Sequence, residues 1–241
     1  MSKRFVAIIQ DKGGQSKSWL AAHLWEWIQG QGAAPMWNLV EIEQKLEFTM
    51  SRYFGDNLAT QIPLAIFNEG TQRTDPSLAP LDQLVELTKS GANILVDFGA
   101  SAFSMFSVWL HERRAYTPFL KAGYEFTFLV VVCANDPEAA AFYNKNFEFV
   151  NQLSKGRVLL VKNYRDGTDF RMIDKDKVKR EMPVLQAEPP LAEDFFNGER
   201  RRTLRMVMAD ESLAWRSHTD AEFMIEKLES EFLKNKDILL P

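Results

Sequence analysis

Cysteine and long apolar runs are scarce in this sequence. Its 241 residues include one cysteine, Cys133, which excludes an intramolecular disulfide. The apolar run around Cys133 predicts a buried, inert thiol, as suits a reducing cytoplasm. The run Phe5–Ile9 is far shorter than the roughly 18 residues that suggest a membrane span, and no small-residue cleavage site follows it. We therefore expect a cytoplasmic protein that is neither inserted into a membrane nor exported.

Histidine and net charge are also low. The three histidines, His23, His111 and His218, are scattered without metal-ligand spacing, so we assign them no chemistry. A formal net charge of -4 argues against a protein that coats nucleic acid over its whole surface. Basic clusters at 175–180 and 200–205 are most simply interpreted as solvated helix faces, and contact with DNA phosphates is the alternative.

Hydrophobic residues make up 46% of the chain, which is enough to build a core. Short apolar runs alternate with longer amphipathic stretches, a pattern typical of βα units with a buried parallel sheet. We therefore predict an α/β fold of three layers, in which helices flank a mostly parallel sheet. No linker-like segment interrupts the pattern, which predicts one domain over residues 1–241.

The same patterns predict the individual elements. Segment 47–73 is the least regular and is predicted to be a mobile loop. Strands are predicted at Arg4–Gln10, Met36–Ile42, Ile62–Phe67, Ala92–Asp97, Phe126–Cys133, Arg157–Lys162 and Met182–Gln186. Helices are predicted at Lys17–Gly30, Pro76–Ser90, Phe103–Ala122, Pro137–Ser154, Lys175–Arg180, Glu199–Trp215 and Asp220–Asn235.

A loop with two glycines joins the first predicted strand to the first predicted helix, and residues 12–18 read Lys-Gly-Gly-Gln-Ser-Lys-Ser. Phosphates bind at such loops because successive backbone N–H groups point into one concavity and the helix dipole favours an anion. Lys17 would reach the outer phosphates, and the Ser18 hydroxyl would ligate Mg²⁺. The predicted cofactor-binding residues of the loop are Gly13, Gly14, Gln15, Ser16, Lys17 and Ser18.

The loop departs from the usual phosphate-loop pattern at its two flanking glycine positions, which hold Asp11 and Ser16. A serine fits poorly where glycine is favoured, and the Asp11 carboxylate is expected to lie near the phosphates. Weak or absent hydrolysis is therefore expected. A glycine-rich turn that binds no ligand is the alternative, although a turn alone would not require Lys17 and Ser18.

Acidic residues follow two further predicted strands at positions suited to a metal ion. Glu41 and Glu43 alternate along a strand, so both side chains point the same way and could face Mg²⁺ and its waters. Asp97 ends an apolar strand and could hold Mg²⁺ through water. Ordinary solvated acids at a strand end and a loop-capping aspartate are the alternatives.

These motifs, in this order, resemble the deviant Walker A family of ParA and MinD proteins, whose loop carries an extra signature lysine, here Lys12. The resemblance covers residues 4 to about 195 and implies the P-loop NTPase fold. It implies that Lys12 crosses a dimer interface to the partner's nucleotide. It also implies that Glu41 and Glu43 order the metal and the attacking water, and that Asn163 contacts adenine.

The resemblance implies an ATP-binding protein, a weak ATPase with Mg²⁺ that forms a homodimer when nucleotide is bound. A late loop at 190–193 would lie over the base. Atypical family members of this size act in plasmid partition or conjugative DNA transfer, with a protein partner of that system and, in some cases, DNA. Two alternatives stay open: a catalytically degenerate P-loop protein that serves as an interaction or regulatory module, and a small-molecule kinase of the dethiobiotin-synthetase kind, for which the sequence shows no acceptor pocket.

Overall fold

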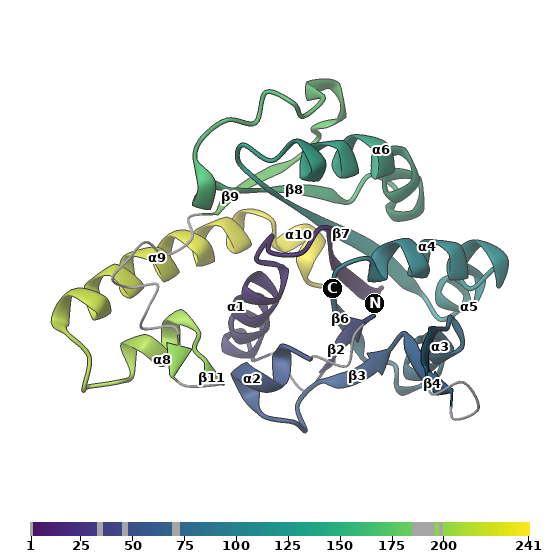
Figure 1. The fold of residues 1–241 in the computed structure, drawn as a ribbon, viewed down its shortest axis with the longest axis horizontal. Coiled ribbons are helices and arrows are strands. Elements are labelled where there is room, and N and C mark those ends of the chain that lie inside the picture. The colour runs from purple at the N-terminus through teal and green to yellow at the C-terminus, as the bar shows by residue number, and fades with distance from the viewer. Residues whose placement is uncertain (1, 33–35, 45–47, 69–72, 185–195, 198–199) are drawn as a thin grey trace.

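The computed structural model describes residues 2–32, 36–44, 48–68, 73–184, 196–197 and 200–241. Its central sheet has seven strands: β1 (Lys3–Ile9), β2 (Trp37–Glu43), β3 (Thr60–Pro63), β6 (Asn93–Phe98), β7 (Tyr124–Cys133), β8 (Val158–Asn163) and β9 (Glu181–Val184). They lie in the order β3-β2-β6-β1-β7-β8-β9, and every neighbouring pair is parallel (Figure 1). Within the described part of the chain, no helix has both the length and the apolar character to cross a bilayer.

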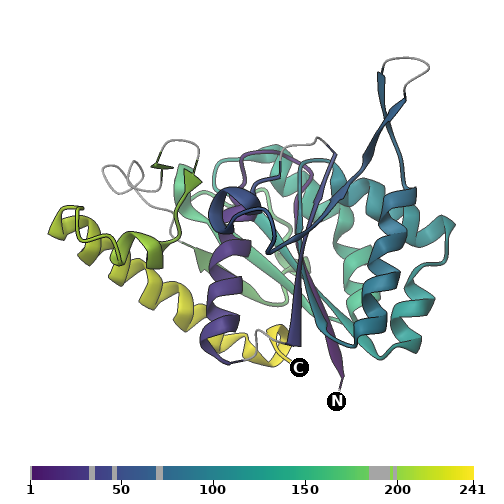
Figure 2. The ribbon, with the colours of Figure 1, turned by 90° about the horizontal axis from the view of Figure 1, so that it is seen from below.

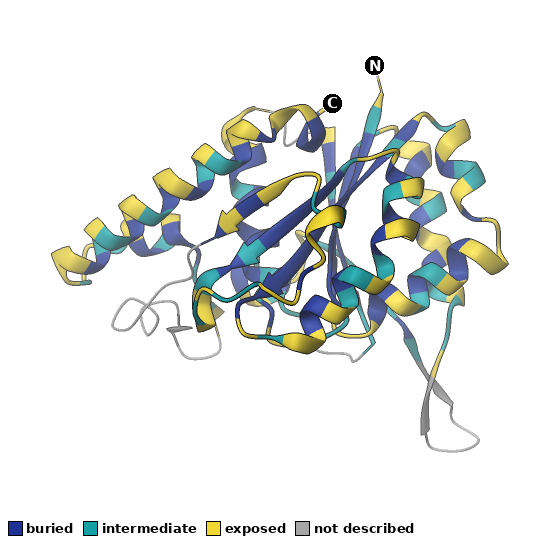
Figure 3. Cartoon of the chain, turned by 90° about the horizontal axis from the view of Figure 1, so that it is seen from above, coloured by how far each residue is buried: buried dark blue, intermediate teal, exposed yellow. Residues whose placement is uncertain are grey.

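Helices cover both faces of the sheet (Figure 2), which confirms the predicted three-layer α/β fold. Alternate residues of β1 enter different cores, since successive side chains of a strand point to opposite faces. The strands between the helical layers are buried (Figure 3). One core includes α3 (Asp82–Leu87), α4 (Ala102–Glu112), α5 (Tyr116–Lys121) and α6 (Pro137–Ser154). The other includes α1 (Lys17–Gly30), α2 (Met50–Phe54), α8 (Leu204–Met208), α9 (Trp215–Lys234) and α10 (Lys236–Leu239).

The prediction of an irregular loop at 47–73 is wrong over its described part. This segment contains α2, then β3, then β4 (Ala65–Asn68), which pairs antiparallel with β5 (Arg73–Pro76) in a hairpin that projects from the body (Figure 2). The single strand predicted at Ile62–Phe67 is thus two short strands in different sheets. Elements of four or five residues are too short to show a helical or strand period.

Helix predictions in the second half also need correction. Glu199–Trp215 is not one helix: β11 (Arg200–Arg201) pairs antiparallel with β10 (Phe196–Asn197), α8 follows, and α9 begins at Trp215. The segment predicted as a helix at 175–180 forms only a 3₁₀ turn, Lys175–Lys177. The helix predicted at 103–122 divides into α4 and α5. The break lies next to Arg114, whose φ of 49° is incompatible with a continuous helix.

A buried polar contact joins α8 to α1. The Nε2 atom of His23 accepts the backbone N–H of Leu204 (2.9 Å), so Nδ1 carries the proton and donates to the carbonyl of Trp19 (2.7 Å). Beside it, the Thr203 hydroxyl donates to Glu26 (2.7 Å), whose other carboxylate oxygen has no hydrogen-bond partner among the described residues. Burial lowers the pKa of His23 to about 4 and raises the pKa of Glu26 to about 7. Both side chains therefore favour their neutral forms.

The substitution Glu26→Gln is expected to remove a pH-dependent loss of stability. The pKa of Glu26 in the folded chain, about 7, lies above its ordinary value of 4.5, so the folded state keeps a proton that the unfolded state releases. The native free energy of unfolding therefore falls as pH rises between these values. We expect the stability of Glu26→Gln relative to the native chain to increase by about 2 kcal/mol from about pH 5 to pH 8.

Urea unfolding at several pH values measures this difference. Glu222→Gln, an exposed change on α9, is the matched control and should follow the native curve. His23 acts in the opposite sense, because its lowered pKa removes stability as pH falls from about 6.5 to 4, but it is common to all three proteins. A stability difference that stays constant with pH would contradict a protonated, buried Glu26.

Candidate functional site

The predicted site residues gather at the carboxyl ends of the central strands. Loop 10–16 follows β1, Glu41 and Glu43 lie in β2, and Asp97 lies in β6. Glu41 is in register with Asp97, so both carboxylates leave the sheet on the same face. Asn163 ends β8, on the other side of β1. Ligands of open parallel sheets bind along this edge.

The outer side of the loop is open. Gly14 has a φ of 74°, and a Cβ atom built on it would meet no described atom within 4 Å. The buried Gln10 side chain fixes the start of the loop by donating to the carbonyls of Val131 (3.0 Å) and Ala139 (3.3 Å). First-turn N–H groups of a helix lack intrahelical acceptors, so the start of α1 can receive an anion above the exposed glycines.

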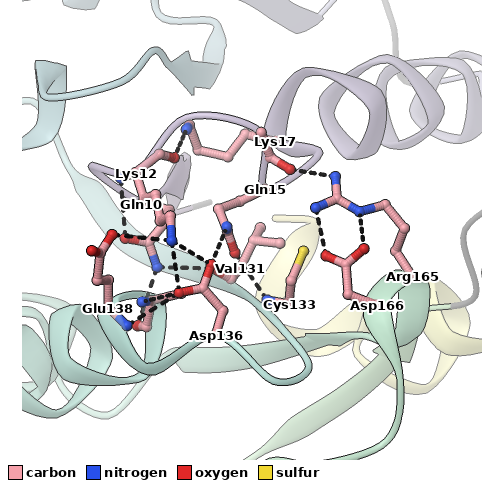
Figure 4. A network of polar contacts seen from close by, with 12 residues as sticks. Gln10, Lys12, Gln15, Lys17, Val131, Cys133, Asp136, Glu138, Arg165 and Asp166 are labelled. Atoms are coloured by element: carbon pink, nitrogen blue, oxygen red, sulfur yellow. Dashed lines mark hydrogen bonds and ion pairs between the residues drawn. The ribbon is translucent and has the colours of Figure 1, made fainter.

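A carboxylate at the start of α6 anchors the loop from the side (Figure 4). Asp136 accepts hydrogen bonds from the Gln15 amide (2.8 Å) and the Lys12 ammonium (3.0 Å), and it caps α6 by accepting two backbone N–H groups. Gln15 also accepts the N–H of Cys133 (2.9 Å), and Lys12 pairs with Glu138 (3.0 Å). Burial alone would raise the pKa of Asp136, but these donors together lower it.

Sequence reasoning missed Asp136 and Gln10. A signal for Asp136 is present, because Asp followed directly by Pro137 is typical of an N-cap and the first helical position. No local pattern marks Gln10, whose partners lie more than a hundred positions away in the sequence.

Lys17 lies beneath the loop, with 6% of its surface exposed. Its ammonium donates to the carbonyl of Lys12 (3.2 Å). Burial lowers the pKa of Lys17, while the nearby carboxylates of Asp97, Glu43 and Asp11 act in the opposite direction. The loop therefore holds a buried lysine next to acidic groups.

Asp97 is fully buried, and neither carboxylate oxygen has a hydrogen-bond partner of normal geometry among the described residues. Burial raises the pKa of Asp97 to about 6, while Ser18, Lys17 and Arg201 lie close enough to lower it. Buried polar groups are nearly always paired, so this carboxylate is an unusual feature of the fold.

Glu41 and Glu43, predicted to act as a pair, have different surroundings. Glu41 accepts the backbone N–H groups of Thr49 and Met50 (2.9 Å for Met50) and so fixes the start of α2. Burial, and secondarily Asp97, raises the pKa of Glu41 to about 8. The Glu43 carboxylate lies directly against the backbone of Gly99, where a Cβ atom would overlap it. Of the two acids, Glu43 is therefore the better placed to meet a ligand.

The Asp11 carboxylate faces α4. It accepts the N–H (3.2 Å) and the hydroxyl of Ser104, and the Asp11 carbonyl accepts the N–H of Ser101 (3.0 Å). The aspartate that stands at this glycine position of the usual pattern therefore stabilises the first turn of α4. The prediction that the Asp11 carboxylate lies near the phosphates did not foresee its hydrogen bonds to Ser104.

Asn163 and Arg165 connect β8 to the loop. Asn163 is 1% exposed, and its Oδ1 atom accepts the N–H of Arg165 (3.0 Å). The Arg165 guanidinium donates to both carboxylate oxygens of Asp166 (2.9 and 2.6 Å) and to the carbonyl of Gly14 (Figure 4). The late loop expected at 190–193 lies outside the described residues.

Ser16 has the left-handed backbone conformation that glycine favours, with φ 66° and ψ 26°. This conformation costs an L-residue roughly 1–2 kcal/mol, although a glycine loses part of the gain through the greater entropy of the unfolded chain. We expect Ser16→Gly to raise the free energy of unfolding by about 0.5–1 kcal/mol, as measured by urea unfolding.

Ser16→Ala is the matched control, because it removes the hydroxyl but keeps the Cβ atom and therefore the backbone strain. It should be no more stable than the native chain. A glycine variant less stable than the native chain would mean that contacts of the Ser16 side chain outweigh the strain.

Comparisons with known proteins find distant similarities in structure and none in sequence. No protein-family model matches the chain, and no curated protein matches it. Among solved structures, the MinD cell division protein of Aquifex aeolicus is similar in chain path, with a TM-score of 0.47 and 15% sequence identity over 97% of this chain and 97% of that one. This similarity assigns no activity and no residue role to the chain.

Proposed function

We propose that the chain is a single nucleotide-binding domain that binds Mg-ATP at loop 12–18. The observation that carries the proposal is the Asp97 carboxylate, which is buried, receives no hydrogen bond of normal geometry from the described residues, and lies beside Ser18 and Lys17. A buried, unpaired carboxylate destabilises a fold. A ligand that brings positive charge to this position would remove that penalty.

The donors around Asp97 suit Mg²⁺. This ion prefers oxygen ligands and, beside phosphates, usually takes one or two of them from the protein. Asp97 and the Ser18 hydroxyl would be its protein ligands, and bound Mg²⁺ would neutralise negative charge on the outer phosphates.

The other side chains have separate roles in this proposal. Lys17 binds the outer phosphates as a buried cation, and the N–H groups of 13–18 hold the phosphate chain. The Glu43 carboxylate accepts a hydrogen bond from the attacking water. Glu41 holds α2, since both its oxygens already accept N–H groups. Asn163 offers its side-chain amide to adenine.

We further propose a weak ATPase of the ParA/MinD kind that forms a homodimer with nucleotide. Plasmid partition or conjugative DNA transfer in the cytoplasm, with a protein partner of that system and with DNA contact, is the proposed setting. The resemblance of the loop supports this setting. Ser16 at a glycine position supports slow hydrolysis, because a side chain there narrows the approach to the backbone.

A degenerate P-loop protein that acts as an interaction or regulatory module is the second candidate. It is favoured by the Lys12 ammonium, which pairs with Asp136 and Glu138 of its own chain. Such a protein would keep the fold and lack measurable affinity for Mg-ATP.

Substitution of Lys17 by alanine tests nucleotide binding. By isothermal titration calorimetry, we expect the native chain to bind Mg-ATP and Lys17→Ala to bind it at least about 30-fold more weakly, because a charge-assisted hydrogen bond contributes about 2 kcal/mol or more. Lys121→Ala, an exposed change on α5, is the control and should bind as the native chain does. Absence of binding by the native chain would sink the ATP proposal and favour the second candidate.

Lys12→Ala separates binding from dimerisation. The Lys12 side chain is 39% exposed, and exposed ion pairs contribute little to stability, so the variant should fold and bind Mg-ATP within about threefold of native affinity. It should lose the nucleotide-dependent dimer seen by light scattering. A variant that dimerises with ATP at native concentrations would show that Lys12 has no role across the interface.

A further inference from the structure

The hairpin of β10 and β11 brings an arginine to the candidate site from the last fifth of the chain. β11 contains Arg200 and Arg201 and packs against α2 (Figure 1). Because α2 is held at its first residues by Glu41, its position relative to β2 and β6 is fixed. The sequence pattern gave the arginine cluster no role beyond a solvated face or a DNA contact.

Arg201 reaches the buried end of α2. Its guanidinium donates a hydrogen bond to the hydroxyl oxygen of Tyr53, a residue only 8% exposed. Burial raises the pKa of Tyr53 to about 12, and Arg201 acts against this shift. Asp97 acts on Tyr53 as well. Tyr53, Asp97 and Arg201 therefore form one cluster, in which Arg201 and Lys17 are the cations that act on Asp97.

The order of the strands gives a direction to a bound nucleotide. With the base at Asn163 on β8 and the phosphate chain at the loop after β1, the terminal phosphate points along the edge toward β6 and β2. Asp97 and Arg201 lie at that end of the site.

The negative charge of a bound triphosphate at this end of the site also requires a cation. Lys17 already faces the carboxylates of Asp97 and Glu43 before any phosphate arrives. A triphosphate adds further negative charge, which a planar guanidinium can bind with two parallel hydrogen bonds.

We propose that Arg201 is a phosphate-binding residue that contacts the terminal phosphate of a bound nucleoside triphosphate and so distinguishes it from the diphosphate. This inference rests on the proposed function. It adds a residue from outside every motif in the sequence, supplied by the same chain in the manner of an arginine finger in cis.

Calorimetric titration of Arg201→Gln with Mg-AMPPNP and Mg-ADP tests the proposal. We expect affinity for the triphosphate analogue to fall about 10-fold or more and affinity for Mg-ADP to change less than about twofold, because only the triphosphate has the group that Arg201 contacts. Arg200→Gln is the matched control: this exposed neighbour points to the opposite side of the same strand and should leave both affinities unchanged.

Arg201→Lys is the control for a folding defect, since it keeps a positive charge near Tyr53. It should bind Mg-AMPPNP with an affinity between those of the native chain and Arg201→Gln, with unchanged unfolding in urea. Equal losses for both nucleotides, or no loss for either, would overturn the role of Arg201 and leave the proposed function standing. If the native chain binds neither nucleotide, the proposed function fails, and the assignment of Arg201 fails with it.

Discussion

The position of the loop at the candidate site depends on the carboxylate of Asp136. This group receives Gln15 and Lys12 from the loop and two N–H groups from the first turn of α6, so it ties together segments more than 120 positions apart. Gln15 adds a second tie, to the N–H of Cys133 at the end of β7. Loop, strand and helix therefore form one hydrogen-bonded unit. These hydrogen bonds fix the shape of the loop from within the chain, which limits the entropy that binding of a ligand must overcome.

The acids at the ends of β2 and β6 are accommodated in three different ways. Glu41 accepts two backbone N–H groups and becomes an anchor for α2. Glu43 lies where Gly99 leaves room for its carboxylate. Asp97, in register with Glu41 on the neighbouring strand, is buried and receives no hydrogen bond of normal geometry from the described residues, and Lys17 and Arg201 only partly offset its charge. Since like charges in a low dielectric repel one another, this end of the sheet is stabilised by added positive charge. That electrostatic need is the physical basis of the Mg-phosphate site that we propose.

Helices α1 and α6 were predictable from sequence with their bounds, and the short elements were not. The bounds predicted for α1 and α6 agree with the structure because 14 and 18 residues show several helical turns. The five residues of α2 show no period, so the partners of Glu41 could not be foreseen, and the two acids looked equivalent. The location of the candidate site at the carboxyl ends of the strands was predictable, because chain direction fixes which end of each parallel strand carries which residue. Contacts from distant segments, such as Ser104 to Asp11 and Arg201 to Tyr53, follow only from tertiary packing.

The pairing of Lys12 with Asp136 and Glu138 raises the question of whether it prevents a role in a dimer. The side chains of Lys12 and Glu138 are 39% and 76% exposed, so water and salt screen this pair, whereas the side chain of Asp136 is 12% exposed. Such an exposed pair contributes little to stability, and the phosphates of the proposed partner would replace it with a charge-assisted contact. Asp136 would keep its bonds to Gln15 and to the first turn of α6 when Lys12 leaves. The Lys12 ammonium can therefore leave its own chain without breaking the other hydrogen bonds of Asp136, so its pairing is compatible with the dimeric, nucleotide-bound state that we propose.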